Sequence, residues 1–131
     1  MNLFAYGTLI FEDIWQQVVG RAVKNGPAEL QGYEVKRVVD DLYPVIQPAP
    51  AERASGVIYF DLTTTDLARL DQYESHFYER IEVHPVNEKN ERITCQTYVL
   101  SESYSSLASE DTWTVQWFAD HAKAEYMKRL S

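Results

Sequence analysis

The sequence is poor in cysteine and in basic residues. The single cysteine, Cys95, cannot form a disulfide within the chain. Only 12 Lys and Arg stand against 20 Asp and Glu, which gives a formal net charge of −8. Such a chain repels a polyphosphate backbone, and no Lys/Arg cluster offers a local exception, so we expect no nucleic-acid partner.

Long apolar runs and leader-like segments are absent as well. No stretch approaches the roughly 18 apolar residues of a membrane-spanning helix. The N-terminus has neither a basic region nor a long apolar run followed by small residues. We therefore expect no membrane role and a cytoplasmic location, in keeping with the lone cysteine.

Neither the histidines nor the serines form a pattern that indicates chemistry. His76, His84 and His121 lack the paired spacing of zinc sites, so we expect no metal. The Ser-rich segment 101–109 does not resemble a strand-turn-helix nucleophile elbow and is predicted to be a polar loop. Cys95 is most simply a core residue.

The composition that remains is that of an ordinary folded domain. With 131 residues, of which 45% are hydrophobic and 24% charged, the chain is long enough to bury one core. We expect a single domain over residues 1–131 and leave its oligomeric state open.

The first half of the chain alternates strand and helix signals. Leu3–Tyr6 is a short apolar strand that ends at Gly7, and the apolar spacing from Phe11 to Val19 predicts an amphipathic helix that ends at Gly20. A long bent strand is predicted at 28–39, in which Gly32 permits a bulge or a bend, followed by an edge strand or loop at 43–50. A strand at 55–60 and a helix at 66–73, capped by Thr63–Thr65, come next.

The second half predicts a hairpin and a final helix. Alternating residues indicate strands at 78–86 and 92–100, joined by the polar run 87–90. The spacing of the apolar residues near the C-terminus predicts a last helix that packs its two tryptophans on the sheet. These residues are Trp113, Trp117, Phe118, Ala122 and Met127.

Glu74 interrupts the apolar pattern of the middle helix. It follows Leu67 by seven residues, which is nearly two turns, so a carboxylate continues the stripe of Leu67 and Leu70. Burial there would raise its pKa and suit it to taking and giving a proton near neutrality. Alternatively, Glu74 is the exposed last residue of the helix or pairs with Arg80.

The loop Tyr6-Gly7-Thr8-Leu9 lies between the first strand and the following helix. Backbone N–H groups at such a place lack partners, and the helix dipole favours an anion. Gly7 lets a ligand approach the backbone. The loop could therefore hold a carboxylate or a carbonyl oxygen that gains charge, or it could be an ordinary tight turn.

Ordered short motifs extend over most of the chain. They are F-A-Y-G-T-L (4–9), L-Q-G-Y (30–33), Y-P-V-I (43–46), S-G-V-I-Y (55–59), L-x-x-L-D-x-Y-E (67–74) and Y-x-R-x-x-V (78–83). In order and spacing they resemble the gamma-glutamylcyclotransferase-like family, in particular the branch of gamma-glutamylamine cyclotransferases and plant avirulence-induced proteins. The sequence departs from the family at Ser75-His76, where Gly often follows the glutamate.

The resemblance implies an α+β fold, with a small mixed β-barrel-like sheet and flanking helices. It also implies a reaction without a cofactor, in which a small gamma-glutamyl substrate releases 5-oxoproline and an amine. Glu74 would be the acid/base, and Tyr6, Gly7, Thr8 and Leu9 would bind the glutamyl part. Tyr78 and Tyr98 are candidates for the pocket wall.

Two other functions are compatible with the same residues. The cavity could belong to a non-catalytic module that binds a small carboxylated metabolite. The acidic surface could serve protein interaction, although only the net charge favours this.

Overall fold

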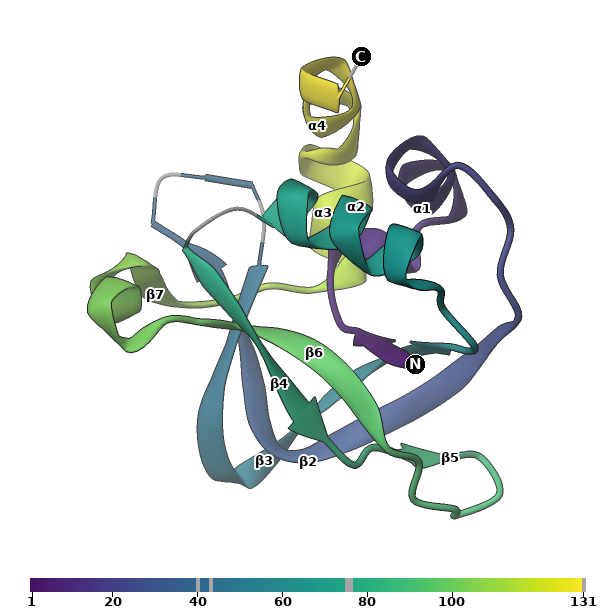
Figure 1. Ribbon diagram of the computed structural model, residues 1–131. Helices are drawn as coiled ribbons and strands as arrows, with labels where there is room; N and C mark the ends of the chain where they lie inside the picture. Colours follow the sequence, from purple (N-terminus) through teal and green to yellow (C-terminus); the bar gives the residue numbers. More distant parts are fainter. Residues whose placement is uncertain (40, 43, 75–76, 131) are drawn as a thin grey trace.

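The computed structural model describes residues 1–39, 41–42, 44–74 and 77–130. Helices α1 to α4 gather at one end of the molecule above a curled sheet, and the C-terminus lies at the far end of α4 (Figure 1). In chain order the elements are β1 (Leu3–Ala5), η1 (Thr8–Ile10), α1 (Glu12–Val19), β2 (Asn25–Val38), β3 (Pro44–Tyr59), α2 (Thr64–Glu74), β4 (Tyr78–Val83), β5 (Val86–Asn87), β6 (Cys95–Leu100), η2 (Glu102–Leu107), β7 (Ala108–Thr112), α3 (Val115–His121) and α4 (Lys123–Leu130).

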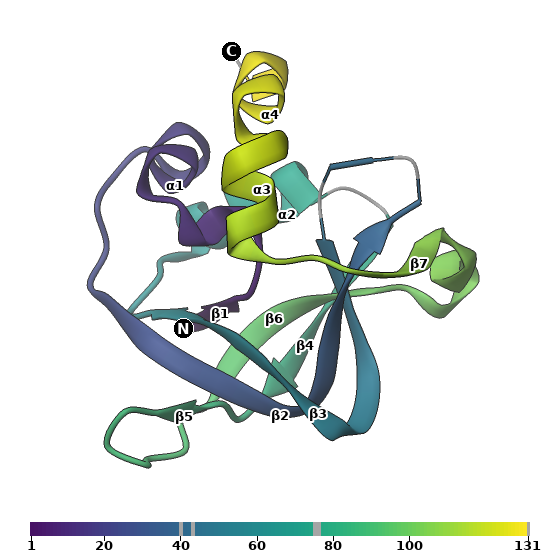
Figure 2. The same cartoon turned by 180° about the vertical axis from the view of Figure 1, so that it is seen from behind.

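A mixed sheet forms the body of the molecule. Its order over the described residues is β4-β6-β1-β3-β2-β5, with β7 also paired to β2. β1 runs parallel to β6 and antiparallel to β3. The long β2–β3 ribbon twists and curls the sheet without closing it (Figure 2). The predicted α+β fold with flanking helices is therefore confirmed, and its barrel-like sheet is an open curl.

The first strand and helix form as their apolar patterns predict. β1 is buried on both faces because Leu3 and Ala5 pack into one core cluster and Phe4 packs into another on the opposite face. Helix α1 buries Ile14, Trp15 and Val19, and Gly20 ends it with a left-handed φ of 86°. The ring of Trp15 stacks on Tyr59 of β3 with a centroid separation of 3.6 Å, which fixes α1 against the sheet.

The ribbon β2–β3 confirms one prediction and corrects another. Gly32 has a φ of 87°, and the register shifts between Gln31 and Tyr33, so the strand is irregular where a bulge or bend is predicted. Two segments are predicted here, an edge strand or loop at 43–50 and a strand at 55–60. The described residues 44–50 and residues 55–59 instead belong to one strand, β3. Among the described residues β1 pairs with residues 57–59 of β3 alone, so β3 has β2 on one edge at Pro48 and no β1 partner on the other, where a missing N–H is tolerated.

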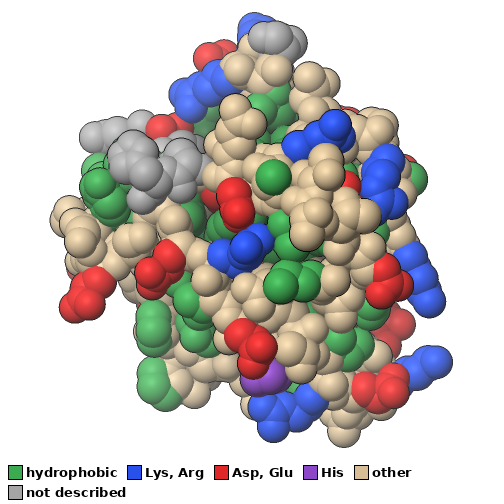
Figure 3. All heavy atoms as spheres, viewed as in Figure 1, with side chains coloured by type: hydrophobic (Ala, Val, Ile, Leu, Met, Phe, Trp, Pro, Cys, Tyr) green, Lys and Arg blue, Asp and Glu red, His purple; other side chains and the backbone are tan. Residues whose placement is uncertain are grey.

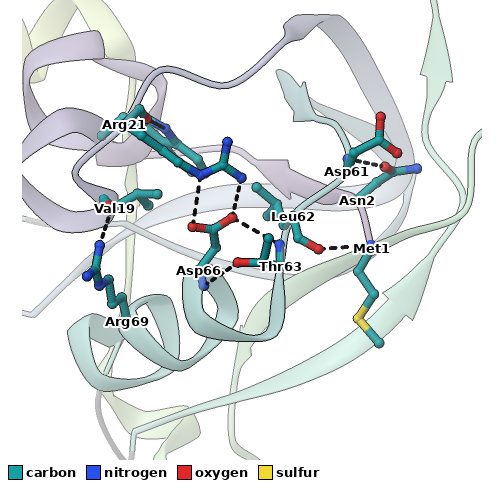
Figure 4. Close-up of polar contacts among 10 residues, drawn as sticks. Met1, Asn2, Val19, Arg21, Asp61, Leu62, Thr63, Asp66 and Arg69 are labelled. Carbon is teal, nitrogen blue, oxygen red and sulfur yellow. Dashed lines mark hydrogen bonds and ion pairs between the residues drawn. The ribbon is translucent and has the colours of Figure 1, made fainter.

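Helix α2 begins with reciprocal capping. Thr63 Oγ1 accepts a hydrogen bond from the Asp66 N–H at 3.1 Å, and Asp66 Oδ2 accepts one from the Thr63 N–H at 2.9 Å. The predicted cap at Thr63 is thus confirmed. Arg21 donates to Asp66, and Arg69 donates to the carbonyl of Val19, so two arginines tie α2 to α1 and its following loop (Figure 4).

The predicted hairpin is present with shorter strands. β4 pairs with β6 from Tyr78 opposite Leu100 to Val83 opposite Cys95. The residues between them include β5, which pairs with β2 at the other end of the sheet path. The hairpin connection therefore crosses to a second partner instead of closing a simple turn.

The C-terminal third differs most from its prediction. The expected polar loop at 101–109 contains η2 and the start of β7, because β7 pairs with β2. Trp113 precedes the helix, and Ala122, with a φ of −131°, separates α3 from α4. Trp113 is nonetheless buried, and its backbone N–H donates to the carbonyl of Val35. The ring of Trp117 lies against the guanidinium group of Arg37 in β2. Both tryptophans therefore pack on the sheet, but one of them does so from outside the helix.

The core consists of two layers separated by β1. Leu3 and Ala5 belong to the layer under the helices, and Phe4 belongs to the layer inside the curl of the sheet. This division follows from the alternation of side chains along a strand. Among the described helices, none has both the length and the apolar character that a bilayer crossing requires.

Candidate functional site

A cavity of about 190 Å³ lies where β1, α2, β4, β6 and α4 meet. All seven residues predicted for the site line it, although they come from three distant parts of the sequence. The lining residues are Leu3, Phe4, Ala5, Tyr6, Gly7, Thr8, Leu9, Pro44, Tyr73, Glu74, Phe77, Tyr78, Tyr98 and Tyr126. The two features singled out in the sequence, Glu74 and the loop Tyr6–Leu9, therefore share one hollow.

The loop leaves β1 and enters the short turn η1, which differs from the prediction that it leads directly into a helix. The N–H of Ile10 donates to the Gly7 carbonyl at 3.0 Å, which closes the turn. Within the described chain, the N–H groups of Gly7, Thr8 and Leu9 have no hydrogen-bond acceptor. They are available to an anion or a polarised carbonyl oxygen, but the positive end of α1 does not lie at this loop.

Gly7 is required at its position by close packing. A Cβ atom on Gly7 would lie 2.3 Å from Cγ of Pro44, the first residue of β3. That distance is far below van der Waals contact, so any larger residue would displace the loop or the strand. The glycine thereby keeps the loop backbone against the cavity wall.

Glu74 is the last residue of α2 and is partly buried. Burial, followed by the negative charge of Asp71 one turn earlier, raises its pKa to about 8. Arg80 pairs with Asp71 at 3.5 Å, and the described residues contain no ion pair between Arg80 and Glu74, so that expected alternative is wrong. Among the described residues, no cationic group lies within ion-pair distance of the Glu74 carboxylate.

Two predicted wall residues use their hydroxyl groups to hold the cavity together. Tyr6 donates to the backbone carbonyl of Tyr98 at 2.6 Å, and Tyr98 donates to Asp71 Oδ1 at 2.6 Å. Burial is the main cause that raises the pKa of both phenols, and the charge of Glu74 adds to it. Both phenols therefore stay protonated near neutrality and act as fixed donors to the protein.

Tyr78 lies at the start of β4 on the opposite side of the cavity. Its hydroxyl donates to the carbonyl of Pro44 at 3.0 Å. This bond joins β4 to the same residue that packs against Gly7. Tyr78 thus lines the cavity wall, as predicted, and its hydroxyl is held by the backbone carbonyl of Pro44.

Sequence reasoning missed two tyrosines of the cavity. Tyr73 Oη lies 2.8 Å from Thr8 Oγ1 and also forms a hydrogen bond with the hydroxyl of Tyr126. The spacing Leu67, Leu70, Tyr73 could have indicated the first, since it continues the buried face of α2. The spacing Phe118, Ala122, Tyr126 could have indicated the second.

Other candidates lie away from the cavity or outside the described residues. Cys95 is buried in the core, as predicted, and burial raises its thiol pKa to about 12. Asp41 pairs with Arg129 at 2.7 Å. Three residues of the predicted motifs lie outside the described part of the chain: Tyr43, Ser75 and His76.

Charges on the exterior do not gather by sign on the face seen in Figure 1. Acidic and basic side chains alternate there with apolar and polar ones (Figure 3). No group of His, Cys, Asp and Glu among the described residues is arranged to hold a metal ion. The chemistry of the cavity therefore centres on one carboxyl group, several phenols and the loop amides.

Fold and cavity together define a small α+β protein in which a carboxyl group of raised pKa faces a strand-to-turn loop. A family model described as "Gamma-glutamyl cyclotransferase, AIG2-like" matches residues 3–116. The chain belongs to this family, which confirms the resemblance found in the sequence.

Individual relatives agree with this assignment. AIG2-like protein D of Arabidopsis thaliana is 29% identical over 100 residues, which cover 75% of this chain and 66% of that protein. The solution structure of an Arabidopsis thaliana protein has a TM-score of 0.73 at 26% identity, covering 98% of this chain and 86% of the other. A solved gamma-glutamyl cyclotransferase shares the fold, with a TM-score of 0.69 at 18% identity, covering 99% of this chain and 85% of the other.

The curated relatives are longer than this chain. The alignments cover 66%, 60% and 57% of AIG2-like proteins D, A and B of Arabidopsis thaliana. The chain therefore spans about three fifths of the length of these relatives.

Proposed function

We propose that this chain is a cytoplasmic enzyme of the gamma-glutamyl cyclotransferase type that acts, as one domain, on a small gamma-glutamyl conjugate. It would release 5-oxoproline and an amine without a cofactor. Glu74 would be the general acid/base, and the loop Tyr6–Leu9 would bind the glutamyl part. The observation that carries the proposal is the shared cavity of Glu74 and the amides of Gly7, Thr8 and Leu9.

The reaction begins with a proton transfer inside the substrate complex. The Glu74 carboxylate removes a proton from the α-ammonium group of the substrate, and the amine nitrogen then attacks the γ-carbonyl carbon. As the new C–N bond forms, the carbonyl oxygen takes up an electron pair and becomes an oxyanion. The amides of Gly7, Thr8 and Leu9 are suited to bind this oxygen.

Collapse of the oxyanion completes the reaction. The carbonyl re-forms, the C–N bond to the leaving amine breaks, and Glu74 returns a proton to that nitrogen. The lactam nitrogen gives up its remaining extra proton to the released amine, which leaves as an ammonium ion, so protons and charge balance and no water is consumed. Because a five-membered ring closes within one molecule, the protein needs only to orient the substrate, move protons and stabilise charge.

The environment of Glu74 supports this role. A carboxyl group with a pKa of about 8 is present in both protonation states near neutral pH, whereas an ordinary glutamate would be a weak acid donor there. The hydroxyl groups of Tyr6 and Tyr98 donate hydrogen bonds to a backbone carbonyl and to Asp71, and their raised pKa values keep them protonated. Glu74 is therefore the cavity group suited to exchange a proton near neutrality.

The test is 5-oxoproline formation from a panel of gamma-glutamyl amines and dipeptides. We expect the wild type to make product and Glu74→Gln to lose at least about 100-fold in rate. Glu79→Gln, at an exposed glutamate of β4, is the matched control and should keep full activity. Equal rates in the wild type and Glu74→Gln would remove Glu74 from the mechanism.

The same experiment tests the binding-module alternative. If no substrate yields product, but L-glutamate or 5-oxoproline raises the melting temperature, the cavity binds a carboxylated metabolite without turnover. Gly7→Ala should abolish that thermal shift, because it disturbs the loop amides.

A further inference from the structure

The C-terminal helix contributes a residue to the cavity. Tyr126 of α4 lines the cavity, and its hydroxyl forms a hydrogen bond with the hydroxyl of Tyr73 at the end of α2. Tyr73 in turn lies 2.8 Å from Thr8 Oγ1 in the loop. Three hydroxyl groups from three distant elements thus form one continuous chain that ends at the loop.

This hydroxyl chain (Thr8, Tyr73 and Tyr126) holds the side chain of Thr8 in place. Thr8 is buried, and leaving a buried hydroxyl without a partner costs about 1–3 kcal/mol. Each group therefore favours the single arrangement in which its neighbour lies within hydrogen-bond distance. A change at Tyr126 can reach Thr8 through one intervening side chain.

Helix α4 has anchors that do not depend on the Tyr126 hydroxyl. The ring of Tyr126 packs edge-to-face on Phe118 with a centroid separation of 5.4 Å. At the start of the helix Lys123 pairs with Asp13 of α1 at 2.8 Å, and near its end Arg129 pairs with Asp41 at 2.7 Å. Removing only the hydroxyl should therefore leave the helix docked while it breaks the hydrogen bond to Tyr73.

We propose that Tyr126 is a positioning residue for the binding loop, which it orders through Tyr73 and Thr8. The proposal rests on the proposed function, because it assigns the loop amides to the substrate. It also extends the site past residue 116, where the family match ends. The C-terminal helix would then set how tightly the loop holds the glutamyl group.

The test compares Tyr126→Phe with Tyr33→Phe. Tyr33 is a partly buried tyrosine of β2, and its hydroxyl has no hydrogen bond within the described chain, which makes it a matched control. We expect Tyr126→Phe to raise KM about 3- to 10-fold while kcat changes less. The pH dependence of kcat should be unchanged, because Glu74 is untouched. Tyr33→Phe should match the wild type.

Amide NMR shifts give a readout that does not need activity. The backbone resonances of Thr8 and Leu9 should move in Tyr126→Phe and stay in place in Tyr33→Phe. Tyr73→Phe should move the same resonances, and the double variant Tyr73→Phe/Tyr126→Phe should have no larger effect on KM than Tyr73→Phe alone, because the chain is already broken.

The outcomes separate the two proposals. If the wild type makes no 5-oxoproline but Tyr126→Phe still moves the Thr8 and Leu9 resonances, the proposed function fails and the positioning role stands. If Tyr126→Phe leaves both KM and these resonances unchanged, the positioning role is wrong. Additive KM effects of the two phenylalanine substitutions would also contradict it, since they would show independent contributions.

Discussion

Tyr98 of β6 donates a 2.6 Å hydrogen bond to Asp71 of α2, and this bond fixes a second carboxylate one helical turn from Glu74. Arg80 approaches the same aspartate from β4 at 3.5 Å. The arginine therefore does not neutralise Glu74, while the aspartate charge adds to the burial that raises the Glu74 pKa. The hairpin and helix α2 together set the protonation state of the candidate catalyst.

Replacing Asp71 by Asn should lower the Glu74 pKa. The carboxamide oxygen can still accept from Tyr98, but the negative charge that opposes Glu74 ionisation is gone. Because the base form must be ionised, the acid limb of the kcat/KM profile should move to lower pH, by about half a unit for charges one turn apart near the surface. A limb that does not move, or moves upward, would contradict this. Asp120→Asn on α3 is the control.

Replacing Gly7 by Ala should damage both stability and activity. The added Cβ would meet Pro44, and relieving the overlap should cost about 1–3 kcal/mol of unfolding free energy. Displacement of the loop amides should lower kcat/KM about tenfold or more. Gly26→Ala is the matched control, since its Cβ would meet no atom within 4 Å. Urea unfolding and steady-state kinetics measure the two effects, and equal behaviour of both variants would refute the packing claim.

Asp66 should stabilise the protein above mildly acidic pH. Its hydrogen bond from Arg21 lowers its pKa to about 2, below the ordinary value of 3.8. The stabilisation is therefore complete above pH 3.8 and is lost as the pH falls through about 2. Asp66→Asn should lower the melting temperature by about 3–6 °C at pH 6, and the difference should vanish near pH 2. Asp61→Asn, at an exposed neighbour in Figure 4, should behave as wild type at both pH values.

Glu74 should destabilise the folded protein at alkaline pH. Its folded pKa of about 8 exceeds the ordinary value of 4.5, so the folded state holds a proton that the unfolded chain releases between these values. Stability from this group is therefore lost as pH rises toward 8. Glu74→Gln should melt above the wild type at pH 9 and close to it at pH 4.5. A melting difference that is independent of pH would contradict the assigned pKa, and Glu79→Gln should show no difference.

Local signals in the sequence were enough for several elements of the fold. The apolar spacing of α1, the cap at Thr63 and the bulge or bend at Gly32 each depend on a few neighbouring residues, and all three are present. The continuity of β3 through Pro48 could not be predicted in this way. Pro48 shows from the sequence that one backbone N–H is missing. Only the pairing of the described strands shows that β1 does not reach the edge of β3 at this position.

The sequence predicted only those site residues that belong to a local pattern or motif. Glu74 stands out because it is a charged residue in the apolar stripe of a helix. The loop Tyr6–Leu9 stands out because its glycine ends the first strand. Tyr73 and Tyr126 gain their place from each other, through the packing of α2 against α4. Helical spacing can indicate that each tyrosine faces the core, but their contact joins residues 53 positions apart, so no local pattern indicates that the two hydroxyl groups meet. For the same reason β7 was missed, because it exists through pairing with β2.

The most direct test of the account is a pH titration by NMR. It would follow the side-chain carboxyl carbon of Glu74, assigned with Glu74→Gln, together with the backbone amides of Gly7, Thr8 and Leu9. We predict one common midpoint near pH 8 for the carboxyl carbon and the loop amides, because the group is partly buried and shares the cavity with them. A carboxyl midpoint near 4.5, or loop amides that do not respond to it, would contradict the account.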